Sequence, residues 1–380
     1  MKAGAPGGGP ASGGFAYPRL MDSHRLRGLA RAGVSVWSDQ LSAAMLDSGE
    51  LARRIEEDAV TGVTTNPTIF AGAIVGSADY TEQLRDLKSD GAEAEEIVKA
   101  LMASDIVRAC DALADVHAAT DGRDGYVSVE VSPALAADTE ATVSEARDWV
   151  KRVNRANLAV KVPATPEGVP AIGRLVGEGI SVNATLIFSL KRYRRVMEAH
   201  AEGLERLRRS GGDPSEVAGV ASFFVSRFDT EVDRRLAEIG TERARRLMGK
   251  TAVANARAAY GEFTRGPGSV ATGGARPQRP LWASTSTKNP SYSDLIYVES
   301  LVAPGSVNTM PLETLDAYRD HGDPSPRPLS EADVEAAERD LRDLEAVGVD
   351  YDDVVEALEE EGVAKFAESW GKLLRAVESA

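Results

Sequence analysis

The stretch N-L-A-V-K-V-P-A-T at residues 157–165 places Lys161 between Val160 and Val162, in a run that is typical of a buried β-strand. Burial disfavours the charged ammonium form of a lysine and therefore favours the neutral amine. A neutral amine attacks a carbonyl carbon to form a Schiff base, which accepts electrons when an adjacent C–C bond breaks. The position of Lys161 therefore predicts covalent carbonyl chemistry.

Further polar side chains stand at the ends of other short apolar runs. Taken singly, each is most simply a turn former, a satisfied core group or a solvated side chain. Their recurrence on successive runs is hard to explain structurally, so we interpret them as one functional cluster. The cluster begins with Asp39, Thr64, Thr65, Asn66, Glu130, Lys161, Asn183 and Thr185, and continues with Ser222, Arg227, Ser284 and Lys288.

Glu130 lies in Y-V-S-V-E-V (126–131), where the period of two of a strand places Ser128 and Glu130 on one face. A carboxylate near Lys161 carries protons while the carbinolamine forms and loses water. Direct contact would stabilise the ammonium form, whereas contact through water would not. The sequence leaves these two arrangements open.

Eight short apolar runs alternate with segments of helical periodicity, which predicts a parallel sheet covered by helices. The runs are 34–37, 62–65, 126–131, 158–163, 180–185, 220–225, 281–285 and 306–310. Eight repeats favour closure into an α/β fold of the (β/α)8 TIM-barrel type, whose active site lies at the carboxyl ends of the strands. An open doubly wound sheet is the alternative, but the glycine fingerprint of a dinucleotide site is absent.

Residues 330–379 change in character and predict additional C-terminal helices. Ser330 and Asp333 form a capping-box pattern before an acidic amphipathic segment, and a second helical stretch follows. The Gly/Pro/Ser-rich residues 1–18 predict a disordered tail. We therefore expect a single barrel domain over residues 19–380 that includes these helices.

The bulk composition limits the partners. A net charge of -15 argues against a nucleic-acid or anionic-membrane partner. No apolar run approaches the roughly 20 residues of a membrane span, and no secretory signal is recognisable. The single cysteine, Cys110, excludes an intrachain disulfide, and the scattered histidines predict no metal site. We expect a cytoplasmic monomer or homodimer.

Four motifs carry a resemblance to a known family. G-V-T-T-N-P-T-I-F (62–70), N-L-A-V-K-V-P-A-T (157–165), G-I-S-V-N-A-T-L-I-F-S (179–189) and V-N-T-M-P (307–311) closely resemble the transaldolases, in their longer bacterial branch. The resemblance runs in order from about residue 20 to residue 375. It implies a barrel of the class I aldolase type that transfers a dihydroxyacetone unit between sugar phosphates in the pentose phosphate pathway, without a cofactor.

The resemblance also implies roles for individual residues. Lys161 would form the Schiff base, and Glu130 with Thr185 would hold the water that relays protons at the imine. Asp39 would take the proton from the C4 hydroxyl of the donor. The remaining assignments concern binding: Asn66 and Asn183 to the hydroxyls of the three-carbon unit, Thr64 and Ser222 beside them, and Arg227, Ser284 and Lys288 to the distal phosphate.

Two other functions are compatible with these residues. A related aldolase would release free dihydroxyacetone; such relatives typically carry glutamine in place of the relay glutamate, so Glu130 favours the transferase. A catalytically dead sugar-phosphate binder would not need a buried amine. The lysine at position 288 stands where the family has an arginine, and a lysine loses the bidentate geometry of that contact.

Overall fold

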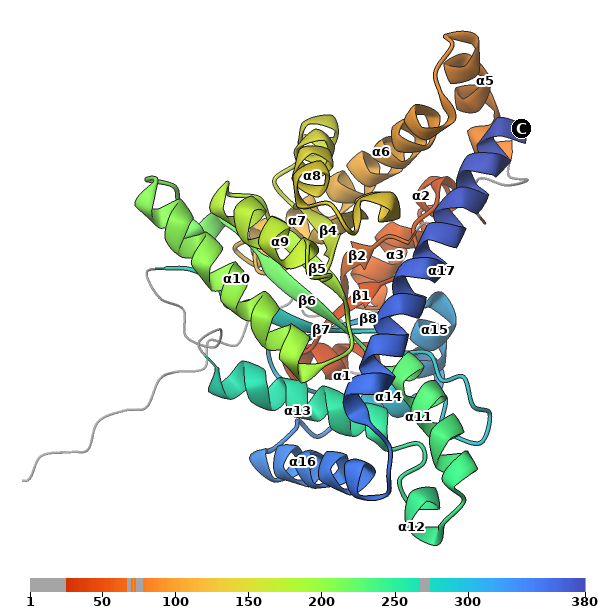
Figure 1. The fold of residues 1–380 in the computed structure, drawn as a ribbon. Coiled ribbons are helices and arrows are strands. Elements are labelled where there is room, and N and C mark those ends of the chain that lie inside the picture. Colours follow the sequence, from red (N-terminus) through yellow and green to blue (C-terminus); the bar gives the residue numbers. More distant parts are fainter. Residues whose placement is uncertain (1–24, 67–69, 71, 73–77, 267–273, 380) are drawn as a thin grey trace, which may run out of the picture.

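The computed structural model describes residues 25–66, 70, 72, 78–266 and 274–379, so the predicted tail at residues 1–18 lies outside the described residues. Eight parallel strands close in sequence order into one barrel, which confirms the (β/α)8 prediction and excludes the open sheet (Figure 1). The strands are β1 (Ser35–Ser38), β2 (Val60–Thr64), β3 (Tyr126–Glu130), β4 (Leu158–Pro163), β5 (Val182–Ile187), β6 (Gly219–Phe224), β7 (Arg279–Ala283) and β8 (Val307–Met310).

Helices surround the barrel, and most lie between consecutive strands. They are α1 (Arg25–Arg31), α2 (Ala43–Asp47), α3 (Glu50–Glu57), α5 (Thr81–Ser89), α6 (Ala94–Ala112), α7 (Ala114–Ala119), α8 (Thr139–Val153), α9 (Gly168–Gly177), α10 (Leu190–Arg209), α11 (Ser226–Ile239), α12 (Glu242–Arg245), α13 (Thr251–Arg265), α14 (Ile296–Glu299), α15 (Leu312–His321), α16 (Glu331–Ala346) and α17 (Tyr351–Ser379). No helix in this described part of the chain is long and apolar enough to cross a membrane.

The two predicted C-terminal helices are confirmed as α16 and α17. The capping box of α16 is formed by Ser330 and Asp333, as the sequence predicts. Helix α16 packs against α13, while α17 runs from α11 past β5 to α6 (Figure 1). Buried residues of both helices, such as Leu344 and Leu373, belong to the same apolar core as the outward faces of the strands.

The amino-terminal half of the barrel interior is mainly apolar, apart from a buried pair of Arg279 and Asp124 at the amino ends of the strands. Every second residue of a strand points inward, and the bulky indole of Trp37 fills space beside β2 because Gly62 has no side chain. A Cβ at Gly62 would lie 2.4 Å from Cε2 of Trp37. The interior cluster consists of Trp37, Tyr126, Ala159, Val220, Leu281, Ala283 and Val307.

Polar side chains replace apolar ones in the next layer toward the carboxyl ends of the strands. The Ser222 hydroxyl donates to Oδ1 of Asn183 at 2.7 Å, and Nδ2 of Asn183 donates to Oγ of Ser128 at 3.1 Å. The hydroxyls of Thr64 and Thr309 share a further hydrogen bond of 2.8 Å. These bonds satisfy groups that would be costly to bury alone, and they form the floor of the site described next.

Candidate active site

The register of the barrel places two predicted catalytic side chains, Glu130 and Lys161, side by side. Glu130 pairs with Lys161 across β3 and β4, and Lys161 pairs with Asn183 across β4 and β5. Asp39 follows β1 directly, and its backbone N–H donates to the Met310 carbonyl at 3.0 Å. The site therefore lies at the carboxyl ends of the strands, as expected for this fold.

Lys161 contacts Glu130 directly, which decides between the two arrangements that the sequence left open. Nζ donates to Oε2 of Glu130 at 3.3 Å and to the Thr65 carbonyl at 3.4 Å. The lysine side chain is 10% exposed and the glutamate side chain 4% exposed. Transfer of one proton from Nζ to this carboxylate leaves two neutral groups, and the neutral amine is the nucleophile.

Both carboxyl groups of the site have raised pKa values. Burial raises the pKa of Glu130 to about 7, against the opposing effect of Lys161 and, to a smaller degree, Arg227. Burial also raises the pKa of Asp39 to about 7, and the Glu313 carboxylate adds to this increase. A carboxyl group with a pKa near neutral pH is suited to exchange protons with a substrate.

Three predicted site residues carry buried polar atoms without a hydrogen-bond partner among the described residues. They are Oδ1 of Asp39, Oγ1 of Thr185 and Nη1 of Arg227. An unpaired buried polar atom costs about 1–3 kcal/mol. Such atoms collected at one end of a barrel indicate positions that a substrate or water occupies.

Some of the remaining predicted residues are held by hydrogen bonds inside the barrel, and others are partly or fully exposed. Asn183 and Ser222 are buried and bonded to each other, and Asn66 is half-buried just beyond β2. The hydroxyl of Ser284 shares a 2.8 Å hydrogen bond with Ser226. Lys288 is exposed and donates to Oγ of Ser286 at 2.6 Å.

The two candidate phosphate-binding cations approach the site from different elements. Arg227 lies in the first turn of α11, and its guanidinium stands 5.3 Å from the ring centroid of Phe224. Burial lowers the pKa of Arg227, against the opposing charges of Glu361 and Glu130. Lys288 lies in the segment after β7. Its charge acts against the raised pKa of Asp39, so Lys288 lies near Asp39 at the catalytic end of the barrel.

Helix α11 holds the Lys288 segment in place through contacts that sequence reasoning missed. The Tyr292 hydroxyl donates to Oδ2 of Asp233 at 2.6 Å, and the Tyr297 hydroxyl donates to Oδ2 of Asp229 at 2.9 Å. The Tyr292 ring packs over Gly249, where a Cβ would lie 2.6 Å from its Cζ. The available signal was the spacing of four between the two aspartates, which puts them on one helical face.

A closed parallel barrel with a lysine–glutamate pair at its carboxyl end has the arrangement of the Schiff-base-forming enzymes among (β/α)8 proteins. The chain belongs to the transaldolase/fructose-6-phosphate aldolase family, whose model matches residues 36–377.

Similar proteins cover nearly the whole chain. The transaldolase of Thermobifida fusca (strain YX) is 53% identical over 354 residues, which are 92% of this chain and 96% of that protein. Transaldolase 1 of Streptomyces coelicolor is 51% identical over 357 residues, which are 93% of each chain. The family resemblance predicted from the four sequence motifs is thereby confirmed.

Proposed function

We propose that the protein is a transaldolase that transfers a dihydroxyacetone unit through a Schiff base on Lys161. The donors would be fructose 6-phosphate and sedoheptulose 7-phosphate, and the acceptors glyceraldehyde 3-phosphate and erythrose 4-phosphate. The observation that carries the proposal is the buried Lys161–Glu130 pair at the barrel mouth, with an unpartnered Asp39 oxygen at the same end. The names of the similar proteins support the transferase over the related aldolase.

In the first half of the reaction, the amine of Lys161 attacks C2 of the donor ketose. Glu130 accepts and returns protons while the carbinolamine loses water, with Thr185 holding the water that relays them. Asp39 then takes the proton of the C4 hydroxyl. The C3–C4 bond breaks, its electron pair moves into the imine, and the aldose phosphate leaves an enamine on the lysine.

The second half of the reaction runs in reverse with a new aldehyde. The enamine carbon attacks the carbonyl carbon of the acceptor, and Asp39 returns a proton to the oxygen that becomes the new C4 hydroxyl. Hydrolysis of the imine frees the product ketose and regenerates Lys161. Arg227, Ser284 and Lys288 would bind the distal phosphate, and Asn66, Asn183, Thr64 and Ser222 would surround the three-carbon unit.

Borohydride trapping tests this function directly. The protein is incubated with fructose 6-phosphate, reduced with borohydride, and analysed by peptide mass spectrometry. A transaldolase gives a reduced three-carbon adduct on Lys161 that disappears when erythrose 4-phosphate is added before the reductant. Decay of the adduct to free dihydroxyacetone without an acceptor would instead identify an aldolase, and no adduct would refute the Schiff base.

We expect Glu130→Gln to lower kcat for transfer by about 10²-fold or more, because the relay loses its proton carrier. The pH profile should change as well. Asp39 and Glu130 act in their ionised forms, so log(kcat/KM) should rise with pH and level off above about 7, the pKa of both groups. Below pH 7 the slope should approach two in the wild type. Loss of the Glu130 carboxylate should change this profile in the variant, which rate measurements from pH 5 to 9 would show.

The matched control is Glu145→Gln. The Glu145 side chain is also largely enclosed, at 9% exposed, beside a lysine with Nζ of Lys99 at 3.3 Å, but it lies on α8 outside the barrel. This variant should keep the wild-type rate and pH profile. An unchanged rate and pH profile in Glu130→Gln would remove Glu130 from the relay.

Tyr292→Phe should weaken phosphate recognition without affecting the chemistry. The change removes the hydrogen bond to Asp233, worth about 1 kcal/mol, and loosens the segment that carries Lys288. We expect KM for phosphorylated acceptors to rise about fivefold with kcat nearly unchanged. With unphosphorylated glyceraldehyde as acceptor, the variant and the wild type should behave alike.

Tyr260→Phe is the control for this experiment. It also removes one tyrosine hydrogen bond, from the Tyr260 hydroxyl to the Pro304 carbonyl at 3.1 Å, but not one that holds the Lys288 segment. Equal effects on both acceptors in Tyr292→Phe would contradict a role in phosphate recognition. The cytoplasmic location, the monomeric or homodimeric state and the single domain over residues 19–380 stay predictions from the sequence.

A further inference from the structure

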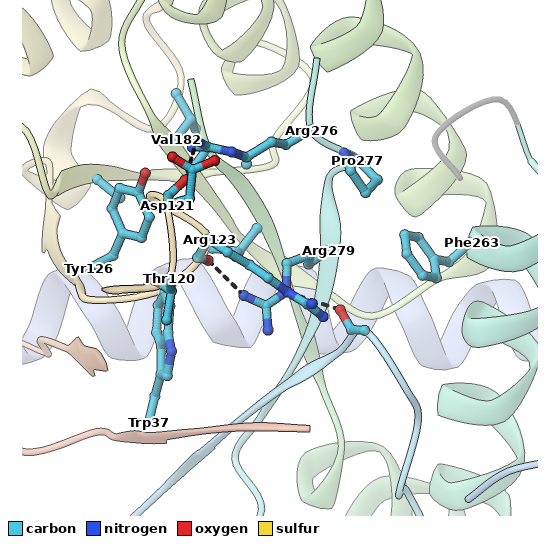
Figure 2. Close-up of a pocket in the computed structure, with 15 residues that line it drawn as sticks. Trp37, Thr120, Asp121, Arg123, Tyr126, Val182, Phe263, Arg276, Pro277 and Arg279 are labelled. Carbon is cyan, nitrogen blue, oxygen red and sulfur yellow. Dashed lines mark hydrogen bonds between the residues drawn. The ribbon is translucent and has the colours of Figure 1, made fainter. Parts of the chain in front are cut away.

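A pocket of about 470 Å³ opens at the amino end of the barrel, opposite the catalytic mouth (Figure 2). Trp37 and Tyr126 line one side, and Phe263 of α13 lies on the other. Its volume falls within the range of about 300–1,000 Å³ that small-molecule sites occupy. No residue assigned to the transfer reaction lines this pocket.

The inner wall of the pocket belongs to the apolar layer of the barrel. Trp37, Ala159 and Val220 line it, and each is an inward-facing residue of a strand. Aromatic and aliphatic walls of this kind favour a flat apolar ligand, because the ligand loses contact with water when it binds.

Arg279 is one of the three arginines at the pocket, and all of its hydrogen-bond donors are used within the protein. Its five N–H groups have five acceptors, so the guanidinium has no donor left for a ligand. The acceptors are the carbonyl oxygens of Gly305, Arg123 and Ser306, the carboxylate of Asp124 and the hydroxyl of Ser35. Asp124 also accepts Nε1 of Trp37 at 2.9 Å, so this network fixes the indole.

Arg276 differs from Arg279 because no carboxylate in the described part of the chain lies within ion-pair distance of its guanidinium. Its terminal nitrogens donate to the backbone carbonyls of Gly122, at 2.8 Å, and Asp121. Among the ion pairs of the described residues, which extend to 4.0 Å, none involves Arg276. Arg276 also opposes the burial-raised pKa of Tyr126 through its charge and a hydrogen bond to the hydroxyl. Since a guanidinium has five N–H groups, these three acceptors still leave donors for a further one.

The other charges around the pocket do not cancel that of Arg276. Hydrogen bonds to Ser215 lower the pKa of the exposed Asp213, and the charge of Arg276 adds to this effect, but the two groups form no ion pair within 4.0 Å. Asp121 and Arg123 lie on the exposed rim with opposite signs, and Arg279 is balanced by Asp124 at 3.3 Å. The field of Arg276 also acts on His117 behind the pocket, whose pKa is lowered by burial and further by this arginine. One positive charge therefore stands beside apolar walls.

We propose that this pocket binds a small organic anion with a flat apolar body and one carboxylate, sulfonate or phosphate group, with Arg276 as the charged partner. The aromatic and aliphatic side chains of the walls contact the apolar body of the ligand, and the Arg276 guanidinium binds its anionic group.

Titration of the full-length protein with 8-anilinonaphthalene-1-sulfonate, an apolar aromatic sulfonate, tests the proposal through its fluorescence. We expect saturable binding of about one probe per chain. Arg276→Met should weaken it about tenfold or more, through loss of the charge-assisted contact. Ala218→Phe should abolish it, because Ala218 lines the pocket and a phenyl ring fills it. Thermal melting confirms that each variant is folded.

Two exposed positions supply matched controls. Arg246→Met removes an arginine whose partner is Glu242 on the surface, and Ala237→Phe adds a ring to the exposed face of α11. Neither should change binding. Equal affinity of Arg276→Met and the wild type would overturn the proposal, as would no saturable binding by the wild type.

A further experiment tests whether the probe binds in this pocket and not in the active site. Protein reduced with borohydride in the presence of fructose 6-phosphate, or bearing Lys161→Arg, should bind the probe as tightly as untreated wild type. Displacement of the probe by fructose 6-phosphate would place it at the catalytic mouth and would overturn the proposal. The result does not depend on whether the protein is a transaldolase.

Discussion

Lys161→Arg should lower transfer between fructose 6-phosphate and erythrose 4-phosphate by about four orders of magnitude or more, because the nucleophile is lost. The guanidinium keeps the positive charge beside Glu130, which is 3.3 Å from Nζ in the wild type, so the ion pair is retained. A guanidinium remains protonated at any pH that the fold tolerates, and it forms no Schiff base. Borohydride should leave the variant unmodified.

Lys99→Arg is the matched control for this loss. Lys99 is similarly enclosed, with an 11% exposed side chain, and pairs with Glu145 and Glu95 on the outer helices. This variant should retain full activity. If Lys161→Arg turned over at the wild-type rate, the Schiff-base mechanism would be wrong.

Asp39→Asn should stop the reaction at a later step and lower kcat by about 10³-fold. The amide cannot take the proton of the C4 hydroxyl, so the C3–C4 bond stays intact. Lys161 and Glu130 are unchanged, however, and the imine with the donor still forms. Borohydride should therefore trap the whole six-carbon sugar phosphate on Lys161 instead of the three-carbon fragment, which mass spectrometry distinguishes.

Asp105→Asn tests whether the loss of C–C cleavage is specific to the carboxylate at the catalytic end of the barrel. Asp105 is also buried, burial raises its pKa, and it accepts the Tyr80 hydroxyl at 2.6 Å, but it lies on α6 outside the barrel. This variant should trap the three-carbon fragment as the wild type does. A three-carbon adduct in Asp39→Asn would assign the cleavage proton to another base.

Periodicity and motif spacing predicted most of the fold. All eight apolar runs form strands, with bounds that differ by at most two residues from those predicted. Shifts of two residues at both ends occur at β5 and β7. Strand β5 begins at Val182 because the Ile180 amide still bonds to the Leu175 carbonyl of α9. Near its other end the ladder shifts before Ile187, with a left-handed φ of 59° at Leu186.

Contacts between distant parts of the chain were beyond sequence reasoning. The alternation in β3 placed Ser128 and Glu130 on one face, but it gave no distance to Lys161. The bond between Tyr292 and Asp233 depends on how α11 packs, which no local pattern encodes. Asp39 was predicted as a site residue, yet its raised pKa follows from burial and from Glu313, which the closed barrel brings near it.

The backbone bond from Asp39 to Met310 has a consequence for the order of events during synthesis. It lies where β1 pairs with β8. The ribosome therefore synthesises the donor, the Asp39 amide, long before the acceptor, the Met310 carbonyl. A nascent chain that lacks β8 has no partner for the edge of β1, and the proton-accepting carboxylate stays unpositioned. Onset of turnover during cell-free translation would therefore mark barrel closure rather than the emergence of the catalytic lysine.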